Sequence, residues 1–170
     1  MGDLRSELRD KLLGRVCLVG IGNPDLGDDG FGVRLAEEIQ AAGYPEVIVA
    51  GTTPERWAGH LAQSGYGTVV FLDVVRIPAE PGAVAFLGAG DLTSKFPQLS
   101  THKLSLGTLA RLIESTSQAK VWLLGTQPKT LLPGSGLSGS VGTTLEALKA
   151  LLCEVLSVRT AEPAVAGERA

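Results

Sequence analysis

The stretch VCLVGIGNPDLGDDGFGVRLAEEI, residues 16–39, decides the fold class. Its first six residues, Val16 to Ile21, are continuously apolar, which is typical of a strand buried on both faces of a sheet. A loop rich in Gly, Asn, Pro and Asp follows, and from Phe31 to Ile39 the apolar residues recur at helical spacing. A buried strand followed by a loop and a helix is the repeating unit of α/β proteins.

The same alternation continues along the rest of the chain. Apolar runs predict further strands at residues 47–50, 68–73, 83–87 and 120–125, and helical patterns predict helices at residues 54–63, from 101 or 102 to 112, and at 145–155. The run at 83–87 follows the preceding strand too closely for a helical crossover, so we expect it to be antiparallel. We therefore predict a three-layer α/β/α fold with a mostly parallel, five-stranded sheet that includes one short antiparallel strand.

The size and composition of the chain indicate one domain. Of its 170 residues, 44% are hydrophobic and 19% are charged, which is a globular composition and argues against disorder. We find no internal repeat and no linker that would divide the chain. We expect a single domain over residues 1–158 and a flexible tail, rich in Ala, Glu and Pro, over residues 159–170.

Charge and cysteine content exclude several functional classes. The formal net charge of -3 gives no basic surface for nucleic acid. Cys17 and Cys153 lie in separate apolar runs without CxxC spacing, so we expect two buried free thiols rather than a disulfide or a zinc site. There is no signal-peptide pattern, and Val16 to Ile21 is far too short to span a bilayer. We therefore expect a cytoplasmic protein without membrane insertion. Because no coiled-coil pattern appears, we also expect a monomer.

The glycine-rich loop after the first strand differs from a nucleotide-binding loop. It begins with Gly20 and Gly22 in the spacing of a dinucleotide fingerprint, but Asp25 occupies the position of the third glycine. No acidic residue ends the strand at 47–50 to hold a ribose, and there is no Walker motif. The loop therefore does not indicate a nucleotide site.

Polar side chains gather where strands of the predicted sheet end. Asp28 and Asp29 follow the first strand, Asp73 ends the strand at 68–73, and His102 lies at a predicted helix start. Each has a simpler explanation, because Asp is common at helix starts and a single His is more often structural. Ligands of such sheets bind beyond the carboxyl ends of the strands, however, and two carboxylates with one imidazole form a ligand set for a divalent transition metal.

Residues 20–32, GIGNPDLGDDGFG, resemble the opening motif of the NiFe-hydrogenase maturation endopeptidases. Three further segments follow in the order of that family: VFLD at 70–73, STHKL at 100–104 and LGTQP at 124–128. The resemblance covers the chain from about residue 16 to 156. The last two segments look most like the branch that processes formate-hydrogenlyase-type hydrogenases.

The resemblance implies a specific activity and partner. Members of this family remove a short C-terminal extension from the precursor of the hydrogenase large subunit after nickel has been inserted. Their nickel-contacting residues correspond to Asp29, Asp73 and His102 here, and the nickel belongs to the substrate. Some members carry Glu where this chain has Asp29, which is shorter by one methylene.

The residues that break the peptide bond are less defined. The sequence shows no Ser-His-Asp, Cys-His or HExxH arrangement. A metal ion can polarise the scissile carbonyl or activate a water, with a carboxylate as general base, and the candidates are Asp28, Asp29 and Asp73. We expect Gln127 to line the substrate groove, and Asn23 either to contact the substrate or to hold its own loop.

Two other functions compete with this interpretation. A peptidyl-tRNA hydrolase has a similar Gly-x-Gly-Asn-Pro opening, but it would need a catalytic His soon after the loop and a basic face for tRNA. Here Asp28 and Asp29 occupy that stretch and the net charge is negative, so both features disfavour it. A non-catalytic nickel chaperone or docking module would use the same three ligands, and the sequence leaves that alternative open.

Overall fold

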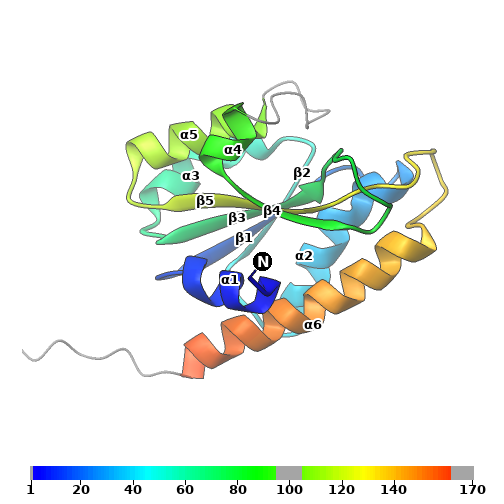
Figure 1. The fold of residues 1–170 in the computed structure, drawn as a ribbon. Helices are drawn as coiled ribbons and strands as arrows, with labels where there is room; N and C mark the ends of the chain where they lie inside the picture. Colours follow the sequence, from blue (N-terminus) through cyan, green and yellow to red (C-terminus); the bar gives the residue numbers. More distant parts are fainter. Residues whose placement is uncertain (1, 95–104, 162–170) are drawn as a thin grey trace, which may run out of the picture.

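A five-stranded sheet lies at the centre of the computed structural model, which describes residues 2–94 and 105–161 (Figure 1). The strands lie in the order β2-β1-β3-β5-β4. Their bounds are β1 Val16–Ile21, β2 Val47–Gly51, β3 Thr68–Val74, β4 Val84–Gly88 and β5 Lys120–Thr126. Strand β4 pairs antiparallel with β5, and the other pairs are parallel. The predicted fold class, with its short antiparallel strand, is confirmed.

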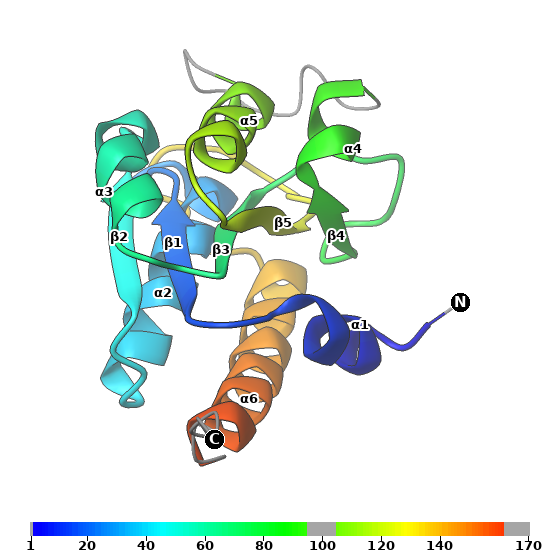
Figure 2. The same ribbon diagram turned by 90° about the vertical axis from the view of Figure 1, so that its left-hand side faces the viewer.

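Helices cover both faces of the sheet (Figure 2). One face carries α1 Leu4–Lys11, α2 Phe31–Ala41 and α6 Gly139–Ala161, and the other carries α3 Ala58–Gln63, α4 Ala89–Ser94 and α5 Leu106–Thr116. Short 3-10 turns at Gly27–Gly30 and Pro54–Trp57 precede α2 and α3. The sequence pattern does not predict α1 and α4, because neither exceeds eight residues and a stretch of that length shows little periodicity.

The alternation of side chains along β1 explains why both faces need helices. Cys17, Val19 and Ile21 enter the apolar cluster beneath α3, α4 and α5, whereas Val16 and Leu18 enter the cluster shared with α1, α2 and α6. Every residue of β1 and of β3 is buried, as the continuous apolar runs predict.

Two helix boundaries differ from the prediction. Helix α5 begins at Leu106, later than expected, because Ser105 is extended and its side chain caps the helix by accepting from Thr108 N at 3.1 Å. Residues 95–104, and with them His102, lie outside the described residues. Helix α6 runs to Ala161, so the first residues of the predicted tail are helical, and residues 162–170 lie outside the description.

The cysteine side chains are not joined in a disulfide. Both cysteines are free, with Cys17 buried and Cys153 partly buried. Burial raises the pKa of the Cys17 thiol to about 12, so this thiol stays protonated and inert at neutral pH. In the described part of the chain, none of the helices has the length and apolar character needed to cross a membrane.

Candidate active site

The carboxyl ends of three parallel strands define one edge of the molecule, at the right of Figure 1. The register pairs Gly20 with Leu72 and Asp73 with Gly125, so β1, β3 and β5 end side by side. The loop that follows β1, and the loop of residues 127–138 between β5 and α6, emerge at this edge. This is where open α/β sheets bind ligands.

Two glycines bring Asp29 and Asp73 together at this edge. Gly22 has φ +127°, and a side chain there would collide with the carbonyl oxygen of Asp29. The same position lies 3.6 Å from Asp73 Oδ1. A side chain at Gly32 would collide with the carbonyl oxygen of Leu72, so the start of α2 packs directly on the end of β3. The backbone carbonyl of Asp29 and the carboxylate of Asp73 therefore both lie against Gly22.

Asp29 is held by its own loop. Its side chain is 5% exposed, its Oδ2 accepts a hydrogen bond from Asn23 N at 2.8 Å, and its own N–H donates to Leu26 O at 3.1 Å. Within residues 2–94 and 105–161, no donor contacts Asp29 Oδ1. Oδ2 is thus engaged in fixing the side chain, and no donor in the described part of the chain occupies Oδ1.

Asp73 is buried at the end of β3, with 2% exposure, and its Oδ1 accepts from Val74 N at 2.8 Å. A buried carboxylate is costly unless it is paired or coordinates a metal, and oxygen donors of this kind suit divalent metals. Asp29 and Asp73 both lie against Gly22, and their role as metal ligands stays a prediction. Among the described residues no third His, Cys, Asp or Glu joins them, and the predicted third ligand, His102, lies outside those residues.

Asp28 has a different environment from its neighbour. It is fully buried, and its Oδ2 accepts from Lys129 N at 2.8 Å, Thr130 N at 3.1 Å and the Ser138 hydroxyl at 2.9 Å. Its Oδ1 accepts from Ser138 N at 2.7 Å. Burial alone would raise the pKa of this carboxyl, but the donors from Ser138, Thr130 and Lys129 outweigh it and lower the pKa below its ordinary value.

The Asp28 carboxylate therefore joins the first loop to the loop of residues 127–138. With four donors on its two oxygens, it is better placed to hold that loop than to accept a proton from a water. Its predicted catalytic role stays a prediction, and the geometry favours a positioning role.

The side chains of Asn23 and Gln127 both bond within the protein. Asn23 Oδ1 accepts from Asp25 N at 2.9 Å, which closes a turn in the first loop. Gln127 Oε1 accepts from Ile77 N at 2.6 Å, and its amide donates to Pro128 O at 3.2 Å. Each residue holds a loop at the candidate site. Their substrate contacts remain predictions.

Two residues near the site have no signal in the sequence. Ser138 binds Asp28 across 110 residues of chain, and no local motif predicts such a pairing. Arg34 lies on α2 with its Nε near Gly30, since a Cβ atom added at Gly30 would lie 3.4 Å from that nitrogen. Arg34 Nε is buried and has no hydrogen-bond partner among the described residues. Arginine is common on the polar face of amphipathic helices, so the sequence gives no sign that Arg34 Nε is buried.

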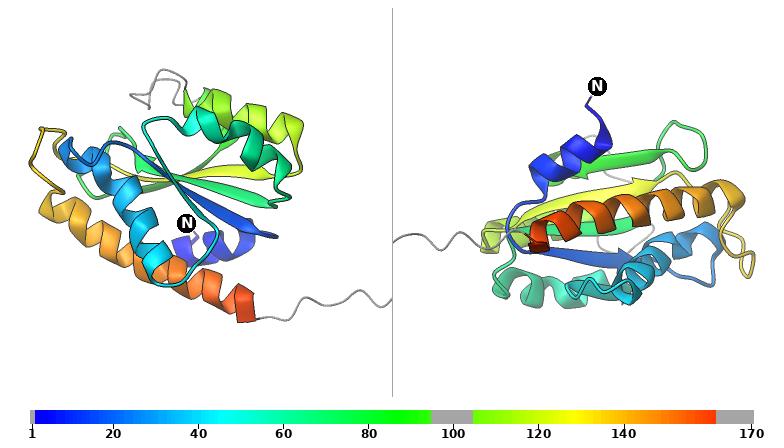
Figure 3. Two further views of the ribbon diagram at one scale, coloured as in Figure 1. Left: turned by 180° about the vertical axis from the view of Figure 1, so that it is seen from behind. Right: turned by 90° about the horizontal axis from the view of Figure 1, so that it is seen from below.

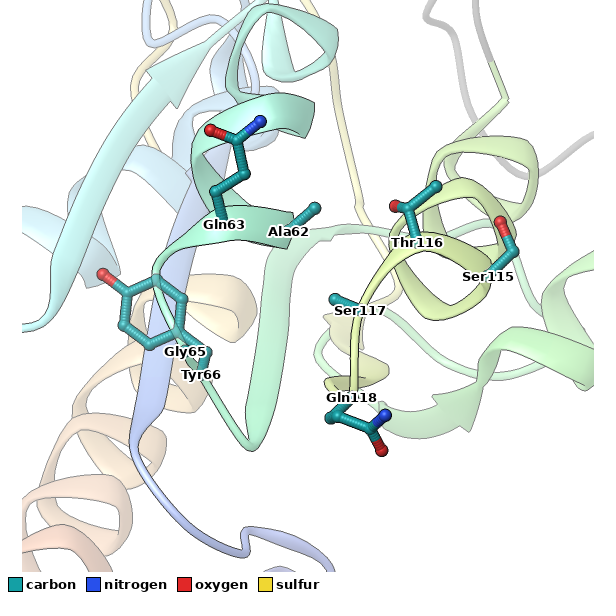
Figure 4. Close-up of a pocket in the computed structure, with 8 residues that line it drawn as sticks. All are labelled: Ala62, Gln63, Gly65, Tyr66, Ser115, Thr116, Ser117 and Gln118. Carbon is teal, nitrogen blue, oxygen red and sulfur yellow. The ribbon is translucent and has the colours of Figure 1, made fainter.

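A cavity of about 650 Å³ lies at the opposite edge of the sheet, between the carboxyl ends of α3 and α5 (Figure 4). Gln63 and Tyr66 line one side, and Thr116 and Ser117 line the other. The Thr116 and Ser117 hydroxyls donate to carbonyl oxygens of their own helix, at 2.7 Å each. This cavity is remote from Asp29 and Asp73 and does not belong to the candidate site.

The chain resembles known proteases of hydrogenase maturation in sequence. A model of the family described as hydrogenase maturation protease matches residues 32–155, a span that includes Asp73 and His102 and begins just after Asp29. The hydrogenase 2 maturation protease of Escherichia coli (strain K12) is 27% identical over 139 residues, which cover 78% of this chain and 84% of that protein. The hydrogenase 3 maturation protease of the same organism is 29% identical over 113 residues, covering 65% and 71%.

Solved structures agree with these sequence matches. The maturation protease HycI of Thermococcus kodakarensis KOD1 superimposes with a TM-score of 0.78 at 30% identity, over 89% of this chain and 99% of that one. The endopeptidase HybD of Escherichia coli superimposes with a TM-score of 0.71 at 24% identity, over 85% and 93%, which shows a shared fold.

Proposed function

The chain belongs to the hydrogenase maturation protease family, and we propose that it removes a C-terminal extension from a NiFe-hydrogenase large-subunit precursor that already carries nickel. Membership makes the chain a peptidase of hydrogenase maturation, and it favours this activity over a tRNA hydrolase or a non-catalytic nickel chaperone. Relatives include proteases of hydrogenase 2 and of hydrogenase 3, so the branch stays open. A cytoplasmic, monomeric enzyme remains an expectation.

The convergence of Asp29 and Asp73 around Gly22 is the observation that supports recognition of nickel. Carboxylate and imidazole donors accept Ni(II), and a set of only three leaves room for the ligands that the substrate already provides. Such an incomplete set binds free metal weakly and completes its coordination on a metal seated in the precursor. We therefore assign Asp29, Asp73 and His102 to the nickel-contacting site, with nickel as part of the substrate.

The cleavage step needs a base to accept a proton from the attacking water. We place that base in the pair Asp29 and Asp73, at a carboxylate oxygen that does not contact nickel, rather than at Asp28. Asp29 retains an oxygen without a donor in the described part of the chain, whereas both oxygens of Asp28 are occupied. The substrate's nickel would supply Lewis acidity at the scissile carbonyl.

The test is processing of two forms of the same precursor, one loaded with nickel and one nickel-free, followed by mass measurement of the product. We expect cleavage of the loaded form only. Asp29→Asn, Asp73→Asn and His102→Ala should each lower the cleavage rate by on the order of 100-fold or more, because each removes a metal-contacting donor. Asp25→Asn, an exposed carboxylate of the same loop, should retain the full rate.

Either half of the proposal can fail separately. Processing of nickel-free precursor at the normal rate would rule out nickel as the recognition element. Normal cleavage by the three variants would remove these residues from the site while leaving the peptidase activity in place.

A further inference from the structure

The loop of residues 127–138 presents an apolar tip beside the candidate active site. Leu132 is 66% exposed, the most exposed large hydrophobic side chain among the described residues. Pro133, next to it in the sequence, is also exposed, and so is Pro24 on the neighbouring first loop. Gly134 N donates to Asp25 O at 2.9 Å, which places the tip directly against the first loop.

The tip is held in place by its backbone. Leu132 N donates to Thr130 Oγ1 at 3.2 Å, and Leu132 O accepts from the Ser135 hydroxyl at 2.8 Å. The base of the loop is fixed by the Asp28 carboxylate, and Asp28 N also donates to Thr130 O at 2.9 Å. Ordering a loop costs conformational entropy. Because Leu132 is exposed, it contributes no hydrophobic burial within the isolated chain that would offset this cost. Binding residues lie disproportionately on loops that a rigid scaffold positions.

The tip is also coupled to the proposed nickel-contacting site. Asp28 holds the loop, and the next residue, Asp29, contributes a carboxylate to the site. Asp28 and Asp29 are neighbours in one short turn, and Asp28 holds the loop that carries Leu132. A partner that contacts Leu132 therefore has a fixed position relative to Asp29. The loop of residues 127–138 projects at the right of the molecule in Figure 1, and Leu132 at its tip is exposed. A projecting side chain fits a hollow on a folded partner better than it fits an extended peptide.

We propose that Pro24, Leu132 and Pro133 form a docking rim for the folded body of the hydrogenase large-subunit precursor, adjacent to the extension that is cut. The rim binds an apolar hollow on that body and sets the position of the extension at Asp29 and Asp73. This inference rests on the proposed function. A small apolar rim suits an enzyme that must release its product, because it adds affinity without a large interface.

The test compares two similarly exposed leucines, Leu132 and Leu13. Leu132→Asp changes the rim, and Leu13→Asp changes a leucine that is 60% exposed on the segment between α1 and β1, at the opposite edge of the sheet. KM and kcat are measured with the nickel-loaded precursor by mass spectrometry of the product. We expect Leu132→Asp to raise KM by on the order of 10-fold or more with kcat within about 2-fold of wild type, since one buried leucine contributes that much to affinity. Leu13→Asp should leave both unchanged.

A milder variant, Leu132→Ser, guards against disturbance of the loop by the new charge and should raise KM in the same direction. Unchanged KM in both Leu132 variants, or a loss confined to kcat, overturns the docking rim while the proposed function stands. Absence of cleavage by the wild-type enzyme overturns the proposed function, and the docking rim with it.

Discussion

The backbone at Gly22 has φ +127°, a conformation that L side chains rarely adopt, and the Asp29 carbonyl oxygen fills the space where a side chain would project. Asp73 Oδ1 lies next to the same position. The sequence shows Gly22 only as one of several glycines in a loop, and the need for it follows from the approach of Asp29 and Asp73. The identity of this residue thus sets how close the Asp29 backbone can come to β1 and to Asp73.

We expect Gly22→Ala to lower the free energy of unfolding by about 2 kcal/mol or more, because alanine strains the backbone and displaces the Asp29 carbonyl. Cleavage should fall further than stability alone explains, since the displaced backbone carries Asp29 away from Asp73. Urea denaturation and precursor cleavage by the folded fraction measure the two effects. Gly90→Ala is the control, because Gly90 has open space around it and an ordinary φ. Equal stability of Gly22→Ala and Gly90→Ala would contradict this account.

At the scale of elements, the strands that carry the site can be predicted from the sequence, whereas the contact between its two loops cannot. The strands β1, β3 and β5 follow from apolar runs, and their parallel pairing brings Asp29 and Asp73 to one edge. The contact of Asp28 with Ser138 does not follow, because it joins residues 110 positions apart and depends on how the loop before α6 folds back. Local sequence patterns predict helices and strands. The hydrogen-bond partners of a carboxylate between two loops depend on how those loops pack together, which local patterns do not predict.

The connection made by Asp28 predicts a pH effect. The pKa of this carboxyl is lowered in the folded state from an ordinary value of 3.8, so the charged form stabilises the fold above that pH. The stabilisation is lost as the pH falls from about 5 towards the lowered pKa, because the unfolded chain then binds the proton first. Wild-type protein should therefore lose stability over this acid range.

Asp28→Asn should lower the free energy of unfolding at pH 7 by roughly 2 kcal/mol. The side-chain NH₂ of asparagine cannot accept the hydrogen bonds that the replaced carboxylate oxygen accepts, so donors on both sides are left without an acceptor. The difference from wild type should shrink towards pH 3. Urea denaturation at several pH values measures both effects, with the exposed Asp25→Asn as control. A difference that stays constant from pH 7 to pH 3 would show that the Asp28 charge plays no part in holding the loop.

At the scale of the whole molecule, α1 closes the face of the sheet that α2 and α6 cover. Figure 3 shows α6 lying between α1 and α2 in the view from below. Leu8 and Leu12 are fully buried in the cluster that includes α6. Arg5 and Arg9 pair with Glu154 on α6 at 3.3 and 3.2 Å, and these side chains are 40–51% exposed. The helix is outside the residues matched by the family model, so its role must be read from its packing.

Burial rather than charge should hold α1 in place. Leu8→Ala removes a fully buried side chain, and we expect it to lower the free energy of unfolding by about 3 kcal/mol. Arg9→Ala removes an exposed ion pair, which contributes at most about 1 kcal/mol. Chemical denaturation of both variants, at low and high salt, gives the comparison directly. A larger loss in Arg9→Ala than in Leu8→Ala would mean that the ion pairs with Glu154 attach the helix, and that its apolar face contributes little.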